Sequence, residues 1–140
     1  MEWVTGEAIS SVPAYVRNKA AQLWAAAVGE WYGRKPSAFA EAFPALLRAA
    51  GASERGADML ARCLVSLDED IISHETGVSE ARAGAVKDAM RASGAVVDVF
   101  GVSLRCAASC SAAGSPAGGA CLDALARLVA WADIGLLANA

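Results

Sequence analysis

The chain has 140 residues, of which 56% are hydrophobic and 19% charged, and its 12 basic and 15 acidic residues give a net charge of −3. This composition supports one domain with a buried core and argues against an intrinsically disordered chain. The acidic balance excludes a broadly basic, free-standing nucleic-acid-binding protein, so any RNA contact would be local or shared with other segments.

No targeting or membrane-spanning signal is expected from the sequence. The first residues, MEWVTGEAISS, have neither a basic segment nor an apolar core, so no signal peptide is predicted. The apolar stretches AAQLWAAAVG and LVAWADIGLLA are too short or too interrupted to predict a bilayer-spanning helix. The four cysteines could form disulfides, but without a secretion signal we expect reduced thiols in a soluble, intracellular protein.

Residues 13–32 are predicted to form the first helix. Pro13 suits a first turn, and Gly33 with Pro36 marks the end. Apolar residues at helical spacing predict a buried face made of Val16, Ala20, Leu23, Trp24, Ala27, Val28 and Trp31. Arg17 borders this face, so we expect it to reach a neighbouring repeat with its alkyl stem buried.

A second helix is predicted over residues 37–50, with Ser37 as its N-cap. Its apolar residues, again at helical spacing, are Phe39, Phe43, Leu46 and Leu47. Pro44 lies inside this stretch, where its ring would meet the carbonyl of Ala40. The sequence therefore predicts either a kink at Pro44 or a helix that begins near Phe43.

A third helix is predicted over residues 53–72, with Ser53 as its N-cap. Its predicted buried face consists of Leu60, Cys63, Leu64, Leu67 and Ile71. Asp68, Glu69 and Asp70 follow at its C-terminal end, where negative charge opposes the helix dipole at a modest cost. The segment SHETGVS then predicts a polar loop.

The fourth predicted helix covers residues 80–111 as one continuous element. Its apolar stripe keeps one phase throughout and contains Val86, Ala89, Met90, Ser93, Val96, Val97, Phe100, Leu104 and Ala107. Gly94 and Gly101 lie off the stripe, so we expect them to bend the helix without ending it. The opposite side is expected to carry Lys87, Arg91, Asp98 and Arg105.

The segment SAAGSPAGG, residues 111–119, predicts a break before a fifth helix over residues 121–132. The inward residues of that helix are expected to be Leu122, Leu125, Leu128 and Val129. Asn139 would then suit the N-cap of a further helix.

The predicted elements are all helices, since no segment shows sustained two-residue alternation. Paired helices with short turns and differing stripes favour an open solenoid of helical hairpins over a closed five-helix bundle. The predicted units are a hairpin over residues 13–50, a second over residues 53–111, and half a hairpin over residues 120–140.

Four stretches of the chain occur in the order, and nearly at the spacing, of motifs from one known family. They read VRNKAAQLWAAAVGEWYGRKPSAF, LARCLVSLDEDII, EARAGAVKDAMRASGAVVDVFGVSL and CLDALARLVAWADIGLLAN. The third contains a Lys-Asp-x-Met-Arg pattern at residues 87–91, and the last a Trp-x-Asp pattern followed by Leu137 to Asn139. These stretches resemble the N-terminal part of the tRNA exportins, which are importin-β-like karyopherins. The chain departs from that family at Lys35, where a tryptophan is usual, and at Pro44.

The resemblance implies an α-solenoid of HEAT-like antiparallel helical hairpins, of which the chain would hold about two and a half repeats. It also implies a non-enzymatic nuclear export receptor without a cofactor, which binds tRNA together with the GTP form of the Ran GTPase. The expected partners are tRNA, Ran and nuclear pore proteins, with no membrane. The receptor would be a monomer that shuttles between the nucleus and the cytoplasm through the nuclear pore.

Two charged clusters are candidates for partner contact. In HEAT arrays the second helix of each hairpin lines the concave surface, so a shared basic face could contact phosphates; that face would consist of Lys87, Arg91 and Arg105. An ordinary solvated face, diluted by Asp88 and Asp98, is the alternative. The acidic cluster could meet a basic patch on a partner such as Ran or, more commonly, keep a helix end soluble; it consists of Asp68, Glu69 and Asp70.

Catalytic and metal sites are not predicted. His74 is the only histidine and lies in a polar loop without an obvious nucleophile partner. Cys106 and Cys110 are one helical turn apart, but the helical phase places Cys106 nearly opposite the apolar stripe, and Cys63 and Cys121 face other cores. The alternatives left open are another karyopherin-type HEAT-repeat transport or scaffold protein with protein cargo, and a small helical enzyme or metal protein.

Overall fold

The computed structural model describes residues 11–73 and 80–132, which form helices joined by short turns. In chain order these are α3 (Ala14–Trp31), the 3-10 turn η1 (Pro36–Phe39), α4 (Ala42–Ala52), α5 (Glu54–Leu67), the π-helical turn η2 (Asp68–Ile72), α6 (Glu80–Ala92), α7 (Ala95–Ala112) and α8 (Ala117–Val129). Within those ranges there is no strand, so the predicted all-α class is confirmed. The predictions for His74 and for Leu137 to Asn139 lie outside the described residues.

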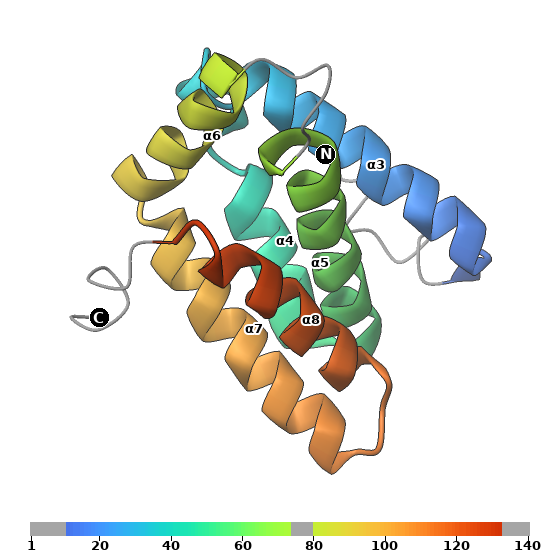
Figure 1. Cartoon of the computed structure of the whole chain (residues 1–140). Helices are drawn as coiled ribbons and strands as arrows, with labels where there is room; N and C mark the ends of the chain where they lie inside the picture. Colours follow the sequence, from blue (N-terminus) through green and yellow to red (C-terminus); the bar gives the residue numbers. More distant parts are fainter. Residues whose placement is uncertain (1–10, 74–79, 133–140) are drawn as a thin grey trace.

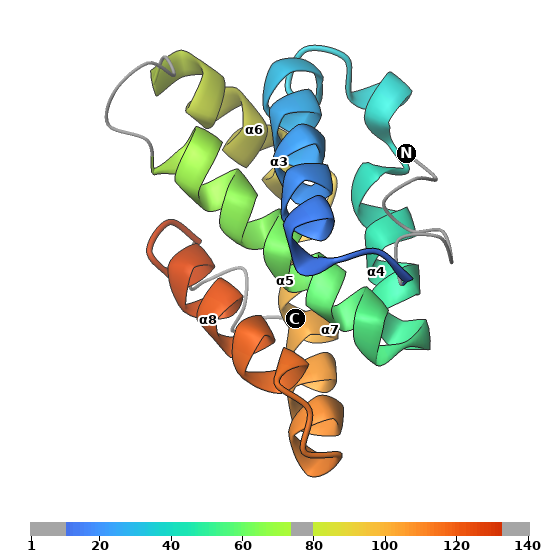
Figure 2. The ribbon, with the colours of Figure 1, turned by 90° about the vertical axis from the view of Figure 1, so that its right-hand side faces the viewer.

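The helices pack in two layers, and α5 is the central helix. Figure 1 shows α8 in front of α7 and α5 in front of α4; α3 and α8 pack against α5, and α4 packs against α7. The central helix α5 packs against α3, α4, α7 and α8, and Figure 2 shows α3 and α8 on opposite sides of it. The division into hairpins 13–50 and 53–111 and a half hairpin over 120–140 stays a prediction.

The first helix agrees with its predicted extent, whereas the predicted N-cap of the second, Ser37, is wrong because that residue lies in the turn η1. The predicted helix 13–32 is α3, and the start near Phe43 is the correct alternative for the second helix, because α4 begins at Ala42. Pro44 is the third residue of α4, where the backbone N–H would lack an intrahelical partner in any case. The proline therefore marks the start of the helix rather than a kink inside it.

The predictions for α5 are confirmed in detail. Ser53 is the N-cap, and its Oγ accepts a hydrogen bond of 3.0 Å from the backbone N–H of Gly56. All five residues of the predicted face are buried: Leu60, Cys63, Leu64, Leu67 and Ile71. After Leu67 the helix widens into the π-helical turn η2, which contains all three acidic residues.

The prediction of one continuous helix over residues 80–111 is wrong. Gly94 has a φ of 75°, a left-handed conformation that glycine adopts without steric cost, and it separates α6 from α7. Beside it, the hydroxyl groups of Ser93 and Tyr32 form a hydrogen bond of 2.8 Å that joins this turn to the end of α3. The predicted stripe nevertheless continues in part across this break, since most of its residues on α7 are buried. Leu104, predicted to face inward, is 53% exposed.

Some predicted buried faces are also rotated. Leu23 and Trp31 are 63% and 41% exposed, because α3 packs through a side rich in small residues: Ala20, Ala21, Trp24, Ala25, Val28 and Gly29.

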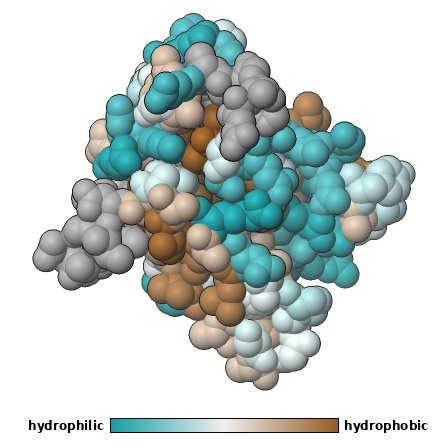
Figure 3. Space-filling view, viewed as in Figure 1, coloured by the Kyte–Doolittle hydropathy of each residue, from teal (hydrophilic) through white to brown (hydrophobic). Residues whose placement is uncertain are grey.

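The predicted break before the last helix is shorter than expected, since α7 extends to Ala112 and α8 begins at Ala117. Leu122 and Val129 of α8, predicted to face inward, are half exposed. Figure 3 shows apolar surface over α7 and α8.

By length and composition alone, α7 could cross a membrane, contrary to the expectation that no stretch of the chain could do so. The predicted element here is part of a longer amphipathic helix. In the structure α7 contacts α4, α5 and α8. Its buried residues are Ala95, Val96, Val99, Phe100, Ser103, Cys106, Ala107 and Cys110. Such burial is typical of a core helix, which has the same apolar composition.

Gly56 lets the start of α5 lie directly against the end of α4. A Cβ at this position would overlap the carbonyl group of Ala49 and lie 2.9 Å from the backbone nitrogen of Ala50. Side-chain rotation cannot relieve a contact with backbone, so Gly56→Ala should lower the free energy of unfolding by about 1–3 kcal/mol in urea denaturation. Gly51→Ala is the control, because a Cβ there meets nothing within 4 Å. Equal losses in both variants would contradict this explanation.

Candidate functional site

Lys87 and Arg91 lie beside the indole of Trp131, at the end of α8. The Lys87 Nζ and the Arg91 Cζ are 5.7 Å and 6.0 Å from the ring centroid, within the range of a cation–π contact. Arg91 also donates to the Trp131 carbonyl at 3.3 Å and to Asp88 at 3.0 Å. These two basic residues of α6 therefore hold the end of α8 through contacts within the chain.

Arg105 lies apart from this pair, in a groove of about 440 Å³ between α4 and α7. The three basic residues thus lie on two helices and not on one, because Gly94 separates α6 from α7. Arg105 is exposed and forms no ion pair within residues 11–73 and 80–132. Lys87 and Arg91 both contact Trp131, whereas Arg105 has no ion pair or cation–π contact among the described residues.

The acidic cluster is divided between two roles. Asp68 is buried; it accepts a hydrogen bond of 2.6 Å from Ser73 Oγ and lies 3.5 Å from Arg127 of α8. Glu69 lies 3.0 Å from the same arginine, so both acids tie η2 to α8. Asp70 is exposed and borders a separate hollow of about 530 Å³ between α3, η2 and α6. The contact with Arg127 is not predicted by the sequence pattern.

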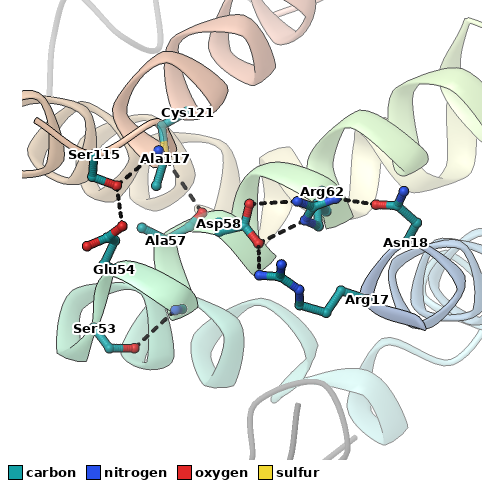
Figure 4. A network of polar contacts seen from close by, with 11 residues as sticks. Arg17, Asn18, Ser53, Glu54, Ala57, Asp58, Arg62, Ser115, Ala117 and Cys121 are labelled. Atoms are coloured by element: carbon teal, nitrogen blue, oxygen red, sulfur yellow. Dashed lines mark hydrogen bonds and ion pairs between the residues drawn. The ribbon is translucent and has the colours of Figure 1, made fainter. Parts of the chain in front are cut away.

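Asp58 is the centre of a network that joins α3 to α5 (Figure 4). Its carboxylate accepts from Arg17 Nη1 at 2.7 Å, and from Arg62 Nε and Nη2 at 2.8 Å and 3.0 Å. Arg62 also donates to Asn18. Arg17 thus reaches the neighbouring helix α5, and its contact with a neighbouring repeat stays a prediction; Asp58 and Arg62 were not predicted. Their opposite charges at a spacing of four residues were the available signal.

A second groove of about 440 Å³ borders this network, between α3, α5 and α8. Its charged lining residues are Asp58, Arg62, Glu69, Asp123 and Arg127, most of which pair with one another. The part of the chain that the structure describes holds no group of three or more His, Cys, Asp or Glu side chains placed to bind a metal ion. The grooves described above therefore offer a partner molecule a surface of matching charge and shape along the helix faces.

Comparison with known proteins decides the family. Residues 13–140 match the family model described as Exportin 1-like protein. The chain belongs to this family. It is 39% identical over 131 residues to Exportin-T of Oryza sativa subsp. japonica, an alignment that covers 91% of this chain and 13% of that protein. The exportin chain therefore spans a small part of this relative's length. No solved structure gives a significant match.

Membership of the exportin family agrees with the architecture. Packed helical hairpins in two layers are the expected arrangement of HEAT-like repeats, so the predicted α-solenoid class is confirmed. The observed differences concern where single helices begin and end and which side of each is buried.

The four cysteines of this exportin chain are free and buried. Cys106, which helical phase placed nearly opposite the apolar stripe, is buried because α7 contacts α4, α5 and α8. Its Sγ donates to the Ala50 carbonyl at 3.5 Å, and Cys121 Sγ to the Ala57 carbonyl at 3.6 Å. Burial raises the pKa of Cys63, Cys106 and Cys121. These thiols pack the helix contacts and are poor nucleophiles.

The stability of this chain should fall above about pH 9 because of these thiols. Burial, together with the neighbouring Cys106 and Cys110, raises the pKa of Cys121 from 9.0 to about 12. Because the pKa of Cys121 is higher in the folded chain than in the unfolded chain, the protonated thiol contributes its full stabilisation of the fold below pH 9.0. This contribution is lost as the pH rises toward about 12. In urea titrations, Cys121→Ala should lose stability less steeply with pH than the parent chain. Parallel curves would show that the Cys121 thiol does not contribute.

Proposed function

We propose that this exportin chain is part of a nuclear export receptor for tRNA, which binds tRNA cooperatively with Ran-GTP and carries it through the nuclear pore. The observation that supports the proposal is the 39% identity to Exportin-T across 91% of the chain. The receptor would be a monomeric binding scaffold, without catalysis or a cofactor, that also contacts nuclear pore proteins. It would shuttle between the nucleus and the cytoplasm without entering a membrane.

Among the basic residues, Arg105 is the first candidate for contact with tRNA phosphates. It is exposed, it lies on a helix of the layer formed by α4 and α7, and no described ion pair competes for its guanidinium. A fixed cation on a rigid helix gains affinity by releasing counterions from RNA. Lys87 and Arg91 would first have to give up part of their contact with Trp131.

Among the acidic residues, Asp70 and Glu69 are the candidates for contact with a basic surface of Ran. Both side chains are exposed, and Asp70 also borders an open hollow. Asp68 is buried by its contacts with Ser73 and Arg127, so it would act by holding η2 in place.

The proposal predicts that Arg105→Glu weakens tRNA binding by the full-length receptor in the presence of Ran-GTP. Loss of one phosphate contact should reduce the slope of log K against log salt by about one, and reduce affinity by roughly threefold to tenfold at low salt. A salt series of binding titrations measures both quantities. Arg34→Glu is the matched control, because Arg34 is an exposed arginine of the turn after α3 that pairs with Glu30. Unchanged affinity and slope in Arg105→Glu would remove this residue from the contact surface.

A competition experiment with a nuclear-export-signal peptide distinguishes the tRNA export receptor from the alternative, a karyopherin-type scaffold with protein cargo. If tRNA is the cargo, an excess of a nuclear-export-signal peptide should leave the complex of tRNA, receptor and Ran-GTP intact. Release of protein cargo by the peptide, with no retention of tRNA in any nucleotide state of Ran, would favour the alternative.

A further inference from the structure

Ser115 lies in the turn between α7 and α8, where it also meets the start of α5. Its hydroxyl donates to the Glu54 carboxylate and accepts from the backbone N–H of Ala117 at 3.2 Å (Figure 4). The turn passes through Gly114, which has a φ of 73°. Ser115 itself is half-buried, and its neighbours Gly114 and Pro116 are exposed. One hydroxyl thus connects the turn to α5 and satisfies an N–H group at the start of α8.

The sequence around this hydroxyl is distinctive. Ser115 and Pro116 form the one Ser-Pro or Thr-Pro dipeptide in the chain. A following proline disfavours the helical conformation for the serine, which suits an accessible turn. This dipeptide is the substrate pattern of proline-directed protein kinases.

We propose that Ser115 is a phosphorylation site for a proline-directed protein kinase, and that the phosphate breaks the contact between α5 and the α7–α8 turn. In the transfer, Ser115 Oγ forms a bond to the γ-phosphorus of ATP as the bond from that phosphorus to the oxygen of the leaving ADP breaks. The hydroxyl proton passes to a base of the kinase. The inference concerns regulation, and it stands independently of the cargo.

Charge explains why the modification would act at this contact. A phosphate carries about −1.5 to −2 charges at pH 7 and has lost the proton that Ser115 donates to Glu54. It therefore repels the Glu54 carboxylate. The N-terminal N–H groups of α8 favour the same phosphate, so α8 remains helical. The expected result is a loosened start of α5 beside an intact α8.

The first experiment is phosphorylation of the whole chain by a proline-directed kinase with ATP, followed by mass spectrometry of the peptides. One phosphate is expected, on Ser115, and none is expected in Ser115→Ala. Pro116→Ala keeps the hydroxyl but removes the recognition residue, so its incorporation should fall at least tenfold. Ser109 and Ser111 are internal controls because neither precedes a proline. No incorporation at Ser115, or the same incorporation in Pro116→Ala, would overturn the assignment.

The second experiment is hydrogen exchange on the phosphorylated chain. Amides in the first turn of α5 should exchange roughly threefold to tenfold faster, as expected for loss of one hydrogen bond, while those within α8 stay protected. Glu54→Gln removes the repelled charge and leaves an amide that can donate to the phosphate, so the acceleration should disappear in that variant. The same acceleration in Glu54→Gln, or none in the parent chain, would overturn the proposed effect on α5.

Discussion

Phe43→Ala should lower the free energy of unfolding by about 3–5 kcal/mol, a large part of the stability of a domain of this size. Phe43 is buried and lies between two aromatic rings of the α3 region. Its ring centroid is 5.3 Å from that of Trp24 and 5.2 Å from that of Tyr32, with interplanar angles of 86° and 70°. Both are edge-to-face contacts, so the substitution removes aromatic interactions as well as buried area.

Urea denaturation followed by tryptophan fluorescence measures this loss. Phe39→Ala is the matched control, since Phe39 is a half-buried phenylalanine of η1 that packs against the edge of the same core. It should lose less than half as much. Equal losses would show that the cluster of Phe43, Trp24 and Tyr32 contributes no more than peripheral packing.

The sequence predicted α5 well because its signals are local. Ser53 marks the first turn through its own hydroxyl, and the apolar residues that follow keep one phase over four turns. Gly94 shows the limit of this approach. Both helices beside it are amphipathic, and their stripes happen to agree in phase, so only the left-handed backbone at Gly94 reveals the break. In α3, periodicity favoured Leu23 over Ala21, but close helix packing buries the smaller residue.

The candidate contacts were predicted less well, because they depend on pairs far apart in the sequence. The chemistry of Lys87 and Arg91 was evident, but their contact with Trp131 requires the path of α8. The sequence pattern favours a solvated Asp68, but the fold places Arg127 of α8 beside it. The charges of Asp58 and Arg62, four residues apart on one helix, could have been paired from the sequence.

Asp58→Ala should lower the free energy of unfolding by about 2–4 kcal/mol, because it leaves two arginines without their shared acceptor in a partly buried site. The side chains of Arg17, Asp58 and Arg62 are 22%, 19% and 27% exposed. Arg17 Nε is buried and has no hydrogen-bond partner within the described residues. The positive charge of the Arg17 guanidinium is therefore balanced mainly by the Asp58 carboxylate. The loss should appear as a lower urea midpoint with an unchanged slope.

Glu41→Ala provides the matched control for this prediction. The Arg48–Glu41 pair has the same N–O distance of 2.7 Å as Arg17–Asp58, but its side chains are 67% and 72% exposed. Its loss should therefore cost no more than about 1 kcal/mol. In an Arg17→Met background the cost of Asp58→Ala should shrink, because one uncompensated charge is already gone. A cost that stays the same in that background, or that equals the cost of Glu41→Ala, would mean that the Asp58 network does not hold α3 against α5.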